Sequence, residues 1–246
     1  MTTPRRMLVP SDGLQLVVET VGRGAPLVFA HGLTGNRQVV LAELVPLTER
    51  YRIVTFDQRG HGDSTAVSDP ALYTPARMAG DVGAVMDALG IQRAIVGGES
   101  MGAATALLFA ITHPERVERL LLTAPAFGDH ANPASQRLKD MGRAIAQLGM
   151  GEFLKLAAVR QREQLGWSAE VIAFVAAQFA SHDTMSLATA LATVPDWQLF
   201  DDLSSLSRVL VPAFVIAWDG DPIHPLPAIF ADPPAVGRMY LRHLSE

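Results

Sequence analysis

Cysteine is absent from the 246-residue chain, which excludes disulfide scaffolds, thiolate metal sites and cysteine nucleophiles together. Neither sign of charge dominates, since 20 lysines and arginines and 25 aspartates and glutamates leave a formal charge of −5. The longest basic run, Arg5-Arg6, is too short to predict a nucleic-acid partner. A long N-terminal hydrophobic run is also missing, because Pro10 interrupts the first apolar stretch. We therefore expect no membrane segment and a cytoplasmic location.

The first half of the chain alternates strand-like and helix-like stretches. Three apolar segments are typical of buried strands in a parallel sheet: residues 26–30, 51–57 and 93–97. Residues 76–89 repeat apolar side chains at the spacing of an amphipathic helix. With 49% hydrophobic and 18% charged residues, a chain of this length can bury a sizeable core. We predict an α/β fold with a mostly parallel central sheet flanked by helices.

The rhythm changes between residues 128 and 207, where no β-rich segment occurs. Four Ala-, Leu- and Gln-rich helical segments follow one another there: residues 134–148, 151–165, 169–181 and 184–193. Strand character returns at residues 211–217. We predict a helical cap of residues 128–207, inserted into a core domain of residues 1–127 and 208–246. The many apolar side chains of this cap favour an apolar ligand beneath it.

The segment Gly98–Gly102, with the sequence GESMG, lies between a predicted strand and a predicted helix. It fits the G-x-S-x-G pattern, in which a serine occupies a sharp turn between the two elements. Small residues are needed on both sides of this turn, and Gly98 and Gly102 supply them. The turn lifts the hydroxyl of Ser100 above the sheet, and the backbone N–H of Met101 can donate to an oxyanion that forms there.

A second glycine-containing loop, His31–Gly35 with the sequence HGLTG, follows the predicted strand 26–30. Glycines such as Gly32 let the loop curl over the strand ends, where ligand sites of parallel sheets lie. The backbone N–H of Leu33 is the candidate for a second oxyanion donor. We interpret His31 as a support of this loop through a hydrogen bond, and the polar loop Asp57–Ser64 as scaffolding.

Five motifs together make the chain resemble the α/β-hydrolase fold superfamily over essentially its whole length: HGLTG, DQRGHGDS, GESMG, HPERV and WDGDPIHP. The resemblance implies a Ser-His-acid triad in which the nucleophile comes first and the histidine last. Ser100 is then the nucleophile. For the acid, Asp221 fits the family pattern better than Asp219, and Asp129 is a more distant alternative. A serine at this turn disfavours the dehalogenases and epoxide hydrolases of the fold, which carry aspartate there.

The triad histidine departs from the family pattern. The chain ends 25 residues after Asp221, and only His224 and His243 follow that acid. His243 would lie just past a last strand at residues 236–241, whereas His224 is within a single turn of Asp221. Three alternatives stay open, with His243, His224 or neither as the base. A short tail would also expose a sheet edge that a second copy could cover, which makes a homodimer a hypothesis.

These residues predict a serine hydrolase that cleaves a carboxylic ester or lactone of a small to medium-sized apolar substrate through an acyl-enzyme intermediate. A carbon–carbon bond hydrolase, or a cofactor-free perhydrolase or lyase, would use the same serine. The alternative from another class is a catalytically degenerate protein that binds a small ligand. We expect no metal and no cofactor, because no histidine spacing fits a metal site and no glycine-rich loop fits a nucleotide.

Overall fold

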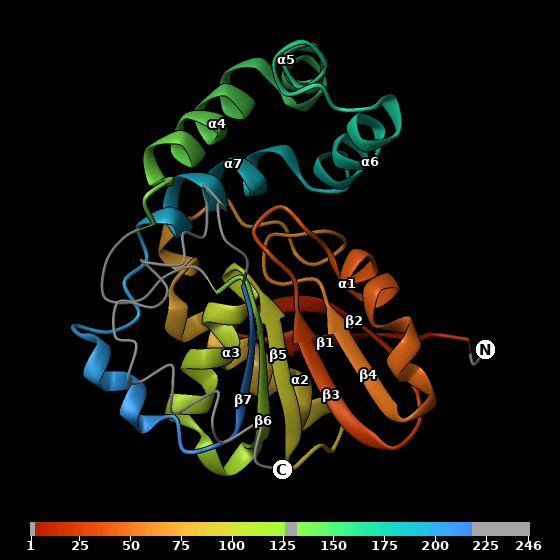
Figure 1. The fold of residues 1–246 in the computed structure, drawn as a ribbon, viewed down its shortest axis with the longest axis vertical. Coiled ribbons are helices and arrows are strands. Elements are labelled where there is room, and N and C mark those ends of the chain that lie inside the picture. Colours follow the sequence, from red (N-terminus) through yellow and green to blue (C-terminus); the bar gives the residue numbers. More distant parts are fainter. Residues whose placement is uncertain (1–2, 126–131, 218–246) are drawn as a thin grey trace.

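The computed structural model describes residues 3–125 and 132–217 (Figure 1). Its strands are β1 (Arg5–Ser11), β2 (Leu14–Gly22), β3 (Ala25–Ala30), β4 (Tyr51–Phe56), β5 (Ala94–Glu99), β6 (Val117–Thr123) and β7 (Ala213–Ile216). The α-helices between these strands are α1 (Arg37–Leu44), α2 (Pro75–Ala88), α3 (Met101–Thr112), α4 (Ser135–Leu148), α5 (Met150–Leu165), α6 (Ala169–Ala180) and α7 (Thr184–Thr193). Where the sequence analysis predicted a range, the observed bounds agree with it to within a few residues.

The described strands form one sheet in the order β1-β2-β4-β3-β5-β6-β7. The two N-terminal pairings, β1 with β2 and β2 with β4, are antiparallel, and the other neighbours are parallel. The predicted α/β fold with a mostly parallel central sheet is therefore confirmed. The predicted strand 26–30 is central, since β3 lies in the middle of the sheet.

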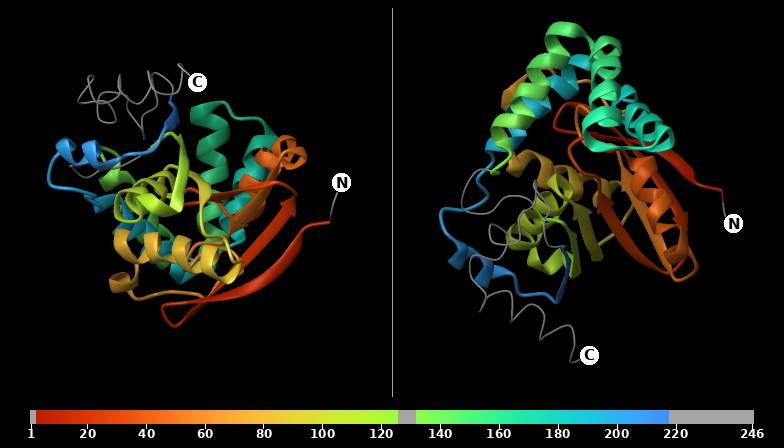
Figure 2. Two further views of the ribbon diagram at one scale, coloured as in Figure 1. Left: turned by 90° about the horizontal axis from the view of Figure 1, so that it is seen from below. Right: turned by 45° about the horizontal axis from the view of Figure 1, so that its top comes forward.

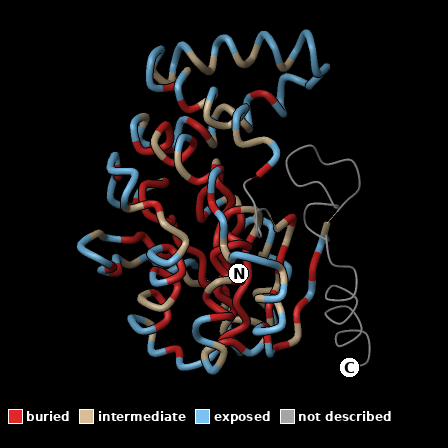
Figure 3. Tube along the Cα trace, turned by 90° about the vertical axis from the view of Figure 1, so that its left-hand side faces the viewer, coloured by how far each residue is buried: buried red, intermediate tan, exposed pale blue. Residues whose placement is uncertain are grey.

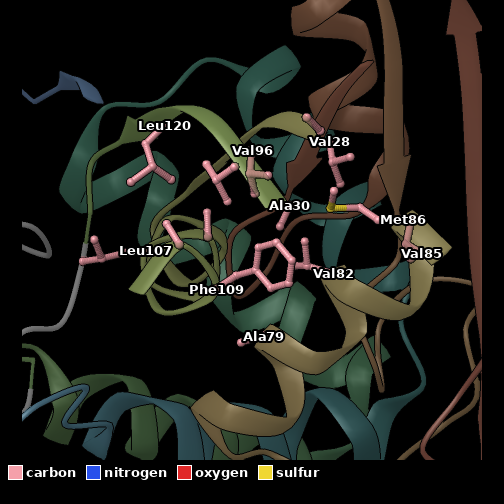
Figure 4. Close-up of a cluster of buried hydrophobic side chains, with 14 of the residues drawn as sticks. Val28, Ala30, Ala79, Val82, Val85, Met86, Val96, Leu107, Phe109 and Leu120 are labelled. Atoms are coloured by element: carbon pink, nitrogen blue, oxygen red, sulfur yellow. The ribbon is translucent and has the colours of Figure 1, made fainter. Parts of the chain in front are cut away.

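Both faces of the central strand β3 are buried from Leu27 to Ala30, which explains why this strand is apolar throughout. On one face, Val28 and Val96 pack in a cluster with Val82 of α2 and Phe109 of α3 (Figure 4). The opposite face of β3 and β4 packs against α1 in a second cluster. A parallel strand covered on both sides has no solvent-facing position, so its sequence shows a continuous apolar run rather than alternation.

The helices α4, α5, α6 and α7, which we call the cap helices, stack at one end of the sheet (Figure 1, Figure 2). α4 packs closely against α7 at Gly142. A Cβ on this residue would lie only 2.8 Å from the carbonyl oxygen of Ala188. Buried residues gather in the sheet and the helices beside it, and α5 has none (Figure 3). The cap helices lie inside the predicted insertion, while the division into two domains stays a prediction.

A buried ion pair ties α2 to the loop after β4. Arg59 donates from Nε and from one terminal nitrogen to the two carboxylate oxygens of Asp81, both at 2.8 Å, and neither side chain is exposed to solvent. The hydroxyl of Ser11 on β1 donates to the same carboxylate. The interpretation of the Asp57–Ser64 loop as scaffolding agrees with this position of Arg59.

We expect Asp81→Asn to lower the free energy of unfolding by about 3 kcal/mol, because it removes the buried counter-charge of Arg59 and leaves the guanidinium with only the partly exposed carboxylate of Asp12, 3.1 Å away. Urea denaturation of purified protein measures this loss. The matched control is Glu152→Gln, which breaks the exposed pair of Glu152 with Lys155 and should leave the unfolding midpoint unchanged. Equal unfolding midpoints for the two variants would show that the buried pair contributes no more to stability than the exposed one.

Candidate active site

Ser100 occupies the sharp turn between β5 and α3, with φ 51° and ψ −113°. Side-chain-bearing residues rarely adopt a positive φ, and such a conformation costs about 1–3 kcal/mol that the surrounding structure must offset. Backbone hydrogen bonds hold it in place, since the N–H of Ser100 donates to the carbonyl of Thr123 and its carbonyl accepts from Ala104. The predicted strand–serine–helix turn is therefore present in the structure.

Two glycines allow this turn because a side chain at either position would collide with backbone. A Cβ on Gly98 would lie 2.3 Å from the carbonyl carbon of Gly102, and one on Gly102 would lie 2.1 Å from the carbonyl oxygen of Ala30. Real Cβ atoms essentially never come this close to other atoms. The close approach also places the end of β3 beside the serine turn.

The loop His31–Gly35 lies next to Ser100, since a Cβ on Gly32 would be 3.5 Å from the Cβ of Ser100. The loop closes on itself through a hydrogen bond from the N–H of Gly35 to the carbonyl of Gly32. Leu33 and Met101, the residues predicted to supply the oxyanion donors, belong to one buried apolar cluster. Their predicted role as N–H donors to an oxyanion stays a prediction.

His31 is fully buried and anchors the loop. Its Nδ1 lies 2.7 Å from the carbonyl oxygen of Gly32, and its Nε2 accepts a hydrogen bond from the N–H of Gln58 at 3.0 Å. Burial lowers the pKa of His31 well below its usual range, so the ring is neutral. These contacts agree with the interpretation of His31 as a support of the loop.

Glu99 is a feature of the site that the sequence reasoning missed. Its carboxyl oxygen Oε1 is 2.8 Å from the position of a Cβ on Gly32, so the carboxyl group rests against the loop beside Ser100. Burial raises the pKa of Glu99, the negative charge of Glu43 raises it further, and a hydrogen bond from Gly32 opposes both effects. The sequence signal was a charged residue at the variable position directly before the serine.

His182, in the turn between α6 and α7, is a second missed residue. Its Nδ1 accepts a hydrogen bond from the N–H of Gly62 at 3.0 Å, and its Nε2 lies 3.1 Å from the carbonyl oxygen of Thr34. Burial lowers the pKa of His182 to about 4, and the neighbouring His61 ring contributes. The side chain thus joins the cap helices to the loops after β3 and β4.

The predicted acid and base, Asp221 and His243, and the alternative base His224, lie outside the described residues, as do Asp219 and Asp129. Their roles therefore stay predictions. In the ranges 3–125 and 132–217, no group of three His, Asp or Glu side chains is placed to hold a metal ion. No helix of those ranges is long and apolar enough to cross a membrane.

The sequence matches the family of the alpha/beta hydrolase fold over residues 25–229, and the chain belongs to this family. A solved hydrolase from Pseudomonas aeruginosa PA01 is 26% identical with a TM-score of 0.76, over 92% of this chain and 84% of that one. A solved N-acyl homoserine lactone degrading enzyme is 25% identical with a TM-score of 0.69, over 95% of this chain and 88% of that one.

Among curated proteins, the chain is 40% identical over 125 residues to the dihydrolipoyllysine-residue acetyltransferase component of the acetoin cleaving system of Cupriavidus necator. This alignment covers 49% of the chain and 32% of that protein. For three curated relatives, the alignments cover 54%, 32% and 42% of the relatives' lengths, so the chain spans about half of them or less. The relatives carry different activities on one fold, so the activity of this chain must be argued from its site.

We expect Gly102→Ala to destabilise the protein strongly or to prevent folding, because the added methyl group would overlap the carbonyl of Ala30. Gly80→Ala is the matched control, since Gly80 lies on α2 with open space around its Cβ position. That variant should gain up to about 1 kcal/mol from the higher helix propensity of alanine. Thermal unfolding followed by circular dichroism measures both, and a Gly102→Ala protein as stable as wild type would contradict the close approach.

We expect the free energy of unfolding to fall as the pH drops from about 6.5 towards 4. A histidine side chain in the unfolded chain has a pKa near 6.5, so His31 and His182 become protonated there in this window. In the folded state both side chains stay neutral, because their pKa values are lowered. The unfolded state then binds more protons, so stability rises with pH. Urea denaturation between pH 7 and pH 5 measures this slope.

His182→Gln should flatten the slope, because the glutamine side chain does not titrate. Comparison of the two profiles removes the opposite contribution of Glu99, whose raised pKa favours the folded state at lower pH. A variant with the full wild-type slope would show that His182 does not carry the pH dependence.

Proposed function

We propose that the protein is a serine hydrolase that cleaves carboxylic esters or lactones of small to medium-sized apolar substrates. The observation that carries this proposal is the position of Ser100, a serine held at positive φ on the turn between a parallel strand and a helix, beside the His31–Gly35 loop. Membership of the alpha/beta hydrolase fold family supports it. A serine in such a turn has its hydroxyl exposed at the strand ends, where a substrate can reach it.

In the proposed reaction, the hydroxyl oxygen of Ser100 attacks the acyl carbon while its proton passes to the imidazole of His243. Asp221 holds the ring tautomer and stabilises the imidazolium. The backbone N–H groups of Leu33 and Met101 donate to the oxyanion of the tetrahedral intermediate. The carbon–oxygen bond of the ester then breaks, and the alcohol leaves with the proton from the imidazolium. Water repeats the sequence on the acyl-enzyme and releases the carboxylic acid.

The apolar character of the region between sheet and cap supports an apolar acyl group. Leu33 and Met101 share their buried cluster with cap side chains such as Ile145 and Phe179. The similarity to a lactone-degrading enzyme over 95% of the chain supports lactones among the candidate substrates.

The test is hydrolysis of a short-chain aryl ester and of a lactone by wild-type protein, Ser100→Ala, His243→Ala and His224→Ala. We expect Ser100→Ala and one histidine variant to lose about 10⁴-fold or more in rate, because serine without its base is a poor nucleophile. Labelling with a fluorophosphonate, followed by mass spectrometry, should place the modification on Ser100.

Two outcomes would contradict the proposal. If wild type and Ser100→Ala hydrolyse the substrates at the same rate, the activity does not use this serine. If neither has activity and a small apolar ligand raises the melting temperature, the protein binds a ligand without turnover.

A further inference from the structure

Three consecutive carbonyl groups of the His31–Gly35 loop each face a ring nitrogen of a different histidine. Nδ1 of His31 is 2.7 Å from the oxygen of Gly32, and Nε2 of His61 is 2.8 Å from the oxygen of Leu33. Nε2 of His182 is 3.1 Å from the oxygen of Thr34. The three rings lie side by side, with 5.1 Å between the centroids of His31 and His61 and 5.3 Å between those of His61 and His182.

The partner of the second nitrogen in each ring shows which nitrogen of the neutral imidazole carries the proton. In His31 and His182 the other nitrogen accepts from a backbone N–H, of Gln58 and of Gly62 respectively. The proton must then sit on the nitrogen that faces the loop, so both rings donate to its carbonyl groups. His61 faces carbonyl oxygens with both nitrogens, those of Leu33 and Arg59, so its neutral ring donates to one of them at a time.

These hydrogen bonds set the orientation of the N–H of Leu33 because a peptide unit is planar. The carbonyl of Gly32 and the N–H of Leu33 belong to one peptide plane, and this carbonyl accepts from His31 and from the N–H of Gly35. The N–H of Gly35 shares its own plane with the carbonyl of Thr34, to which His182 donates. The ring of His182 therefore acts on the N–H of Leu33 through two linked peptide planes.

His182 is the member of this set that comes from the cap. It belongs to the turn between α6 and α7, and this turn and the first turn of α7 make two further hydrogen bonds to the core. Asn36 donates to the hydroxyl of Ser181 at 3.0 Å, and the N–H of Val67 donates to the hydroxyl of Ser186 at 2.8 Å. A shift of the cap helices at this turn would pull His182 away from Thr34.

We propose that His182 is a positioning residue, which holds the His31–Gly35 loop, here called the oxyanion loop, in its active form and links the position of the cap helices to the N–H of Leu33. This inference rests on the proposed function, in which that N–H binds the oxyanion. The effect falls on the transition state rather than on substrate binding, because the oxyanion exists only after the serine attacks.

The test compares His182→Gln with His182→Asn, two neutral amide side chains of different length. Glutamine can place its amide nitrogen near the position of Nε2 and keep the donor bond to Thr34, whereas asparagine places its amide oxygen near the position of Nδ1 and reaches Gly62 but not Thr34. We expect kcat for an aryl ester to fall about tenfold in His182→Asn, the loss that about 1.4 kcal/mol of transition-state stabilisation gives, with KM within about twofold. His182→Gln should restore most of kcat.

Ser186→Ala is the matched control, since it removes a neighbouring cap–core hydrogen bond, from the first turn of α7, that does not touch the oxyanion loop. It should keep the wild-type kcat even where its melting temperature is lower. A similar loss of kcat in Ser186→Ala and His182→Asn, or no loss in His182→Asn, would overturn the proposal.

Amide hydrogen exchange of Gly35, measured by NMR, gives a readout that does not depend on activity. The exchange should speed up in His182→Asn and not in His182→Gln, because the donor bond to Thr34 holds the Gly35 plane. Unchanged exchange with a lower kcat would overturn the proposed mechanism of His182. Inactive wild-type protein, or full activity in Ser100→Ala, would instead overturn the proposed function, so the two failures are distinguishable.

Discussion

The positive φ of Ser100 is the constraint on which the rest of the site depends. The chain can reverse at this point only where Gly98 and Gly102 leave room for backbone on both sides. The same close packing brings Gly102 against the carbonyl of Ala30, at the end of β3. The loop that follows β3 therefore starts within reach of the serine hydroxyl. A single strained turn thus determines where Ser100 and the loop meet, and the buried sheet and α3 hold the strain.

Beyond the ends of β3 and β4, the structure buries the loops that follow these strands, and each buried polar group needs a partner there. Histidines meet this need well, because a neutral imidazole can accept from one backbone N–H and donate to one carbonyl. His31 and His182 both do so. Two fully or largely buried arginines, Arg37 and Arg59, are paired with the carboxylates of Asp57 and Asp81 for the same reason.

Much of the fold could be predicted because the signals are local. The apolar runs of β3, β4 and β5, the helical spacing of α2 and the glycines around Ser100 each depend on residues a few positions apart. The motif after β3 was enough to expect a loop beside the serine. The partners of Glu99 and His182 could not be predicted in this way, because the contact of His182 with Thr34 joins residues 148 positions apart. In the sequence, His182 was only one of several isolated histidines.

The amino-acid sequence alone specified the order of strands and helices, the family and the serine turn, since patterns of a few residues carry that information. The contact of His182 with the His31–Gly35 loop came from the packing of the cap helices onto the strand ends. That packing places a histidine of the α6–α7 turn against a loop near the start of the chain. The carboxyl group of Glu99 is likewise buried by a segment distant in sequence, the loop at Gly32, and its pKa is raised. Burial and long-range pairing are properties of the assembled chain, so they follow only when all of its elements are in place.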